Sequence, residues 1–134
     1  YTVGGLEEAV SVKSQKPLVF VAAEREDEQK ELQKCLAPEF SVLTAGWGSR
    51  MMSLLSRYQE QVALLVLSSA HSEKLLKYRK LRQRLQSVPV VVVAHDTHEA
   101  ERARRAGAND VWELPLVKEQ VIDSARMCMR TPMQ

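Results

Sequence analysis

The hydrophobic residues of this 134-residue chain form short uninterrupted runs, separated by longer stretches with helical spacing. Three of the runs, 18–22, 62–67 and 90–93, contain only apolar side chains. A strand that is apolar on both faces is typical of a parallel sheet with helices on each side. Shorter strands are predicted at 40–44 and 111–112. The pattern therefore predicts five buried, parallel strands.

A helical segment follows each predicted strand. Met51, Leu54, Leu55 and Tyr58 lie at positions i, i+3, i+4 and i+7, which is the stripe of an amphipathic helix. The segment 24–37 begins with an acidic turn, which suits the positive end of a helix. The further helices are predicted at 73–86, between Asp96 and Gly107, and at 116–129.

The best-marked unit of the chain is 88–116. Asp96 is predicted to cap a helix with its side chain, and Glu99, three residues later, completes a capping box. Gly107 ends this helix, because glycine adopts the left-handed conformation without strain. Pro115 ends the strand that follows. The unit is thus a strand–helix–strand crossover, which is right-handed in almost all proteins.

Alternating strands and helices predict the α/β fold class. We expect one doubly wound, five-stranded parallel sheet of order 2-1-3-4-5 with helices on both faces, as in flavodoxin-like proteins. Residues 1–16 are predicted to be a linker or an N-terminal arm, and residues 17–131 the folded domain. In this fold the functional site lies at the carboxyl ends of the strands, so the residues at those ends decide the function.

Composition limits the class of protein. Apolar residues make up 45% and charged residues 27%, and the net charge of +2 is too small to indicate nucleic-acid binding. No apolar run approaches the roughly 18 residues of a membrane span, and no secretory signal is present. A cytoplasmic location is therefore expected. Cys35 and Cys128 are predicted to be buried, reduced thiols rather than a disulfide.

Two segments of the chain resemble the receiver domains of two-component signalling. They are Val88-Pro-Val-Val-Val-Val-Ala-His95 and Ala106-Gly-Ala-Asn-Asp-Val-Trp-Glu-Leu-Pro-Leu116. Receiver domains have an apolar strand that begins Ile/Val-Pro-Val and a later Ala-Gly-Ala-x-Asp-Tyr-x-x-Lys-Pro-Phe segment. The alternation of strands and helices extends the resemblance over residues 17–130. It implies a flavodoxin-like fold and a function in signal transduction.

A working receiver has an acidic pair after the first strand, an acceptor Asp at the end of the third, a Ser or Thr after the fourth and a Lys before the proline of the fifth. The carboxylates bind Mg²⁺, the acceptor is the nucleophile, and the hydroxyl and ammonium stabilise the phosphoryl oxygens. The matching positions here are Ala22, Ala23, Ser68, Ala94 and Leu114, and the switch aromatic is replaced by Val111. The resemblance therefore implies a pseudo-receiver, which is not an enzyme and has no catalytic residue, metal or cofactor.

The resemblance also implies the partners. These are another protein or a neighbouring domain of the same chain, including a second copy in a homodimer, with no membrane and no nucleic acid. The expected contact face comprises the helix that ends at Gly107, the strand 111–112 and the helix 116–129. Trp112 is equally well explained as an interface anchor or as a core residue. The interface candidates are Arg102, Arg104, Arg105, Val111, Trp112, Glu119 and Asp123.

Two other functions stay open. The first is an unconventional receiver, of a response regulator or hybrid kinase, that accepts a phosphoryl group at another residue. The second is a small-ligand-binding domain of flavodoxin type, which is disfavoured because no glycine-rich phosphate loop follows the strand 18–22.

Three further patterns have a simpler explanation. Ser68 with His71 and His95 suggests a nucleophile with bases, but no glycine elbow surrounds the serine. His71, His95 and His98 suggest a metal trio, but polar loop and cap residues explain them better. The basic run 74–84 is best explained as a solvated helix face, because no aromatic platform accompanies it.

Overall fold

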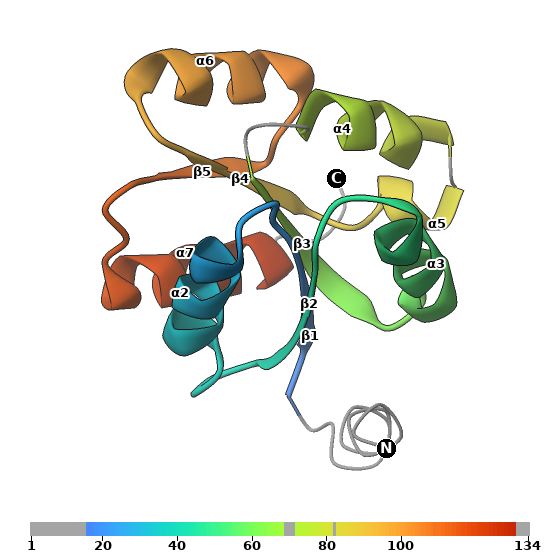
Figure 1. The fold of residues 1–134 in the computed structure, drawn as a ribbon, viewed down its shortest axis with the longest axis horizontal. Helices are drawn as coiled ribbons and strands as arrows, with labels where there is room; N and C mark the ends of the chain where they lie inside the picture. The colour runs from blue at the N-terminus through green and yellow to red at the C-terminus, as the bar shows by residue number, and fades with distance from the viewer. Residues whose placement is uncertain (1–15, 69–71, 82, 131–134) are drawn as a thin grey trace.

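The computed structural model describes residues 16–68, 72–81 and 83–130. The predicted N-terminal arm, 1–16, lies outside these residues except for Lys16. Five parallel strands form one sheet of order β2-β1-β3-β4-β5. Helices cover both faces of this sheet (Figure 1). The predicted fold class and strand order are therefore confirmed.

The secondary structure agrees with the predicted elements to within a few residues. The strands are β1 Leu18–Ala22, β2 Ser41–Ala45, β3 Val62–Ser68, β4 Val90–Ala94 and β5 Asp110–Glu113. The helices are α2 Glu26–Leu36, α3 Ser49–Tyr58, α4 Ser72–Leu81, α5 Gln83–Gln86, α6 Thr97–Ala106 and α7 Lys118–Arg130. Residues 72–81 and 83–86 of the helix predicted at 73–86 are helical, and residue 82 between them lies outside the described residues. α2 begins later than predicted because the backbone of Arg25 is extended, with φ −100° and ψ 140°.

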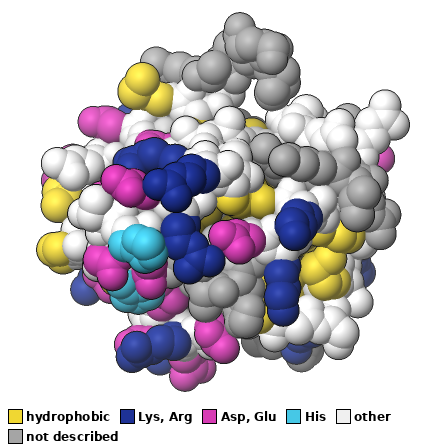
Figure 2. Space-filling model, turned by 90° about the horizontal axis from the view of Figure 1, so that it is seen from above, with side chains coloured by type: hydrophobic (Ala, Val, Ile, Leu, Met, Phe, Trp, Pro, Cys, Tyr) yellow, Lys and Arg dark blue, Asp and Glu magenta, His cyan; other side chains and the backbone are white. Residues whose placement is uncertain are grey.

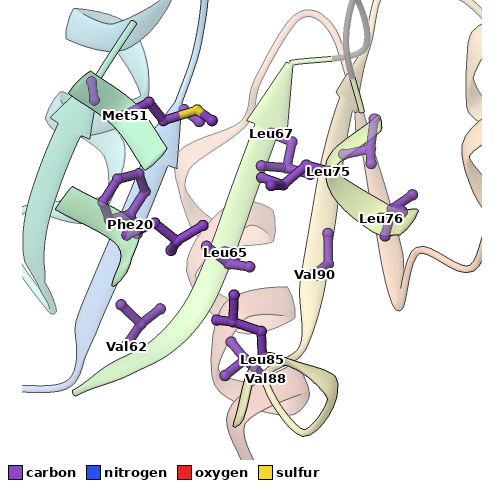
Figure 3. Close-up of a cluster of buried hydrophobic side chains, with 14 of the residues drawn as sticks. Phe20, Met51, Val62, Leu65, Leu67, Leu75, Leu76, Leu85, Val88 and Val90 are labelled. Atoms are coloured by element: carbon purple, nitrogen blue, oxygen red, sulfur yellow. The ribbon is translucent and has the colours of Figure 1, made fainter. Parts of the chain in front are cut away.

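The sheet divides the core into two clusters. Successive side chains of a strand point to opposite faces, so Phe20 and Leu65 belong to one cluster while Val19 and Leu64 belong to the other. The first cluster includes buried residues of α3, α4 and α6, and the second includes those of α2 and α7. Figure 3 shows the first cluster, with Phe20 and Leu65 on neighbouring strands.

The predicted ends of α6 are confirmed. Asp96 Oδ1 accepts a hydrogen bond from the Glu99 backbone N–H at 2.8 Å. Glu99 Oε1 in turn accepts from the backbone N–H of His95, one residue before the cap, at 2.7 Å. Gly107 follows the helix with φ 110°, where a side chain would be strained. These caps fix where α6 begins and ends, and its buried Ala100 and Ala103 pack in the first core cluster.

The two cysteines are free thiols, but they are half-buried rather than fully buried. Each lies on a helix that packs on the second cluster, Cys35 on α2 and Cys128 on α7. Burial is the main cause that raises the pKa of both thiols. Within the described ranges, no helix is both long enough and apolar enough to cross a membrane.

Candidate functional site

The carboxyl ends of four strands meet at one edge of the sheet. Ala22 pairs with Leu67 of β3, and Ser68 pairs with Val93 of β4. The backbone N–H of Leu114 donates to the carbonyl of Ala94 at 3.0 Å. The structure therefore brings together the positions at which a receiver holds its phosphorylation chemistry. They are Ala22, Ala23, Ser68, Ala94 and Leu114.

The side chains at this edge are mostly apolar. Ala22, Ala23 and Ala94 are completely buried, and Leu114 packs half-buried against the second core cluster. Methyl and isobutyl groups offer neither an oxygen ligand for Mg²⁺ nor a positive charge for a phosphate. Ser68 supplies the one hydroxyl among these five positions, and its residue is only 3% exposed.

Trp47 lies in the loop between β2 and α3 and contacts Ser68. Its indole Nε1–H donates to Ser68 Oγ at 3.1 Å. The ring is half-buried and packs against the first core cluster. The hydrogen bond to Ser68 was not predicted, because the two residues are 21 positions apart and β1 separates their strands. The Ser68 hydroxyl thus accepts a hydrogen bond from a side chain that is itself packed on the core.

Glu28 has a partly buried carboxyl that the sequence pattern did not predict. It lies in the first turn of α2, and its Oε2 atom is buried with no hydrogen-bond partner among the described residues. Burial raises the pKa of the Glu28 carboxyl, and the nearby charge of His95 opposes this while Asp27 adds to it. A desolvated carboxylate without a partner destabilises the folded state.

We predict that Glu28 makes stability depend on pH. Its folded-state pKa lies above the ordinary value of 4.5, so the folded state binds the proton more tightly than the unfolded state. The free energy of unfolding is therefore expected to fall as the pH rises from below 4.5 through the raised pKa. The Glu28→Gln variant should lose this fall and be more stable than wild type at pH 7. Urea denaturation at several pH values measures both effects, and Glu31→Gln, an exposed change on the same helix, is the control.

The predicted histidine trio is only partly described, because His71 lies outside the described residues. His95 and His98 are exposed, and His95 Nδ1 lies 3.2 Å from Glu99 Oε1. Among residues 16–68, 72–81 and 83–130, no group of three or more His, Cys, Asp or Glu side chains is arranged to hold a metal ion. His95 directly precedes the Asp96 cap of α6, and His98 lies in the first turn of this helix.

Five of the seven interface candidates are exposed. Arg102 pairs with Glu73 at 3.3 Å and Arg105 with Glu101 at 3.7 Å. Val111 and Trp112 are instead 8% and 6% exposed, so neither is available as a surface contact. The exposed candidates are Arg102, Arg104, Arg105, Glu119 and Asp123.

Trp112 is buried because α7 packs on the face of β5 that belongs to the second core cluster. Its Nε1–H donates to Ser124 Oγ at 2.8 Å, and the Ser124 hydroxyl donates to the carboxylate of Asp110. The ring belongs to the second core cluster. Of the two explanations for Trp112, the structure therefore supports the core residue.

Comparison with known proteins supports the fold and leaves the family open. No family model matches the chain, and no curated protein matches it in sequence. The chain is similar in structure to a response-regulator receiver domain from Bermanella marisrubri, with 16% identity, a TM-score of 0.74 and coverage of 87% of this chain and 100% of that one. A response regulator from Thermotoga maritima has 18% identity and a TM-score of 0.69, with coverage of 87% and 99%.

A third similar structure bears on the site. The receiver domain of a sensor histidine kinase from Pseudomonas aeruginosa holds a magnesium ion in its active-site cleft. It has 9% identity with this chain and a TM-score of 0.71, with coverage of 85% of this chain and 98% of that one. At such low identities the likeness establishes the fold alone. The chain thus has the fold of a receiver domain, and its function has to be inferred from its own residues.

Proposed function

We propose that this domain is a non-phosphorylatable pseudo-receiver, which regulates a partner in signal transduction through protein–protein contacts. The observation that carries the proposal is the environment of Ser68. This residue aligns with the acceptor Asp of a receiver, it is buried, and its hydroxyl accepts a hydrogen bond from Trp47. A buried hydroxyl that already has a partner is poorly placed to attack a phosphoryl donor.

Electrostatics supports the same proposal. A phosphoryl group carries about −1.5 to −2 charges at neutral pH, and transfer requires cationic groups that stabilise this charge. A receiver supplies this positive charge as a Mg²⁺ ion, bound by its acidic pair, and as a lysine. This chain has Ala22 and Ala23 in place of the acidic pair and Leu114 in place of the lysine. The nearby Glu28 carboxyl, whose own pKa burial raises, would add repulsion when ionised. Phosphorylation at this edge is therefore strongly disfavoured.

The partners follow from the same proposal. Without chemistry at the sheet edge, the domain would act by docking to another protein, to a neighbouring domain of its chain or to a second copy, in the cytoplasm. Exposed charged residues of α6 and α7 are available for such contacts. These are Arg102, Arg104, Arg105, Glu119 and Asp123.

A phosphorylation assay tests the proposal. The domain is incubated with acetyl phosphate and Mg²⁺, beside a receiver domain known to accept phosphate from this donor, and both are measured by intact-protein mass spectrometry. We expect the known receiver to gain the mass of a phosphoryl group and this domain to gain none.

A phosphorylated product would contradict the proposal and favour the unconventional receiver. The Ser68→Ala variant then locates the acceptor. Loss of the adduct in this variant would identify Ser68, whereas an adduct that persists would lie on another residue.

A further inference from the structure

A groove runs between α4 and α6, away from the sheet edge described above. Its volume is about 460 Å³. Each helix lines it with residues at positions i, i+3 and i+4, which lie on one face of a helix. Figure 2 looks onto the side of the molecule on which α4 and α6 lie, where Lys and Arg side chains are interspersed with Asp and Glu side chains. The lining residues are Glu73, Leu76 and Lys77 of α4, and Arg102, Arg105 and Ala106 of α6.

The groove has an apolar floor and a basic rim. Leu76 is buried and Ala106 half-buried, so their side chains form the inner surface. Lys77, Arg102 and Arg105 are exposed around them. Among the described residues, the lining contains three cations and one acid, Glu73.

The ion pair that spans the groove is easily exchanged. Arg102 Nη2 lies 3.3 Å from Glu73 Oε2, and the two side chains are 57% and 53% exposed. Exposed ion pairs contribute little to stability, because water screens them. A carboxylate from a partner can therefore replace Glu73 beside Arg102 at little cost to the fold.

We propose that this groove binds an acidic segment of a partner protein that also carries an apolar side chain. The carboxylates pair with Lys77 and with Arg102 and Arg105, whose exposed ion pairs to Glu73 and Glu101 they exchange. The apolar side chain packs on the floor formed by Leu76 and Ala106. This inference rests on the proposed docking function and gives the chemistry of the partner. A single-stranded nucleic acid fits less well, because the described lining residues include no aromatic side chain on which a base stacks.

Fluorescence polarisation with a defined probe tests the groove. The probe is a fluorescein-labelled peptide in which glutamates flank a central leucine, and it is compared with the same peptide carrying lysines and with a single-stranded oligonucleotide of equal charge. We expect saturable binding of the acidic peptide and none of the basic one. Replacing the central leucine by serine should weaken binding, since the floor of the groove is apolar.

A matched pair of double variants distinguishes binding in the groove from non-specific electrostatic attraction to the protein surface. Lys77→Glu with Arg105→Glu reverses two cations in the groove. Lys74→Glu with Arg104→Glu reverses two exposed cations on the same helices that do not line it. We expect binding about tenfold weaker in the groove variant and changed less than about twofold in the control. Thermal unfolding checks that both variants are folded.

Three results would overturn the inference. They are no saturable binding of the acidic peptide, equal weakening in both variants, or a preference for the oligonucleotide that the groove variant abolishes. The last would assign the groove to nucleic acid. The Lys77→Glu, Arg105→Glu variant changes no residue at the sheet edge. Phosphorylation of the wild-type domain in the acetyl phosphate assay would therefore refute the proposed function independently of the peptide-binding result.

Discussion

The Leu65→Ala variant is expected to lose about 3 kcal/mol of unfolding free energy. Leu65 lies at the centre of β3, is completely buried, and pairs with Phe20 on one side and Val90 on the other. Its side chain is in the first core cluster (Figure 3). Truncation removes apolar contacts and leaves a cavity between rigid strands, which cannot close around it.

Urea denaturation measures this loss as a lower midpoint with an unchanged slope. Leu54→Ala is the matched control, because it makes the same chemical change at a half-buried position of α3. We expect the control to lose less than half as much. Equal losses in the two variants would show that β3 is not the most constrained part of the core.

The runs of apolar residues predicted this core because the spacing of apolar side chains is a local property of the sequence. Four consecutive valines at 90–93 fit only a strand with both faces covered, and the structure buries all of them. Asp96 and Gly107 act through backbone groups a few residues away, so they too were predictable. The sheet order followed from the alternation of elements.

The unpredicted features depend on contacts between distant segments. Trp47 reaches Ser68 across β1, and the environment of Glu28 depends on how α2 sits beside His95. Trp112 was ambiguous because its burial depends on α7, which begins after Pro115. Spacing along the chain predicts which residues share a face of an element, but not which distant side chain covers them.

The Ser68→Asp variant tests directly whether restoring the acceptor restores a receiver. We expect it to lose about 3 kcal/mol of unfolding free energy at pH 7, because an ionised carboxylate would be buried without a cationic partner. Ser68 is 3% exposed, and its neighbours at the edge include Ala22 and Ala94. Ser68→Ala is the control, and it should lose only about 1 kcal/mol with the hydrogen bond from Trp47.

The two losses should also differ in their dependence on pH. Burial raises the pKa of a carboxyl, so the destabilisation by Asp at position 68 is expected to grow as the pH rises above about 4 and to fade below it. The loss in Ser68→Ala should stay constant over the same range. Urea denaturation of both variants at several pH values tests this difference.

Phosphorylation of the Ser68→Asp variant is expected to remain undetectable in the acetyl phosphate assay. A nucleophilic carboxylate alone is insufficient, because Ala22 and Ala23 hold no Mg²⁺ and Leu114 provides no ammonium group. A phosphorylated Ser68→Asp variant would mean that other residues supply these functions, and the proposed loss of the site would then be wrong. If the variant is stable at pH 7 yet unphosphorylated, the edge is better hydrated than the burial of Ser68 indicates, and only the stability argument fails.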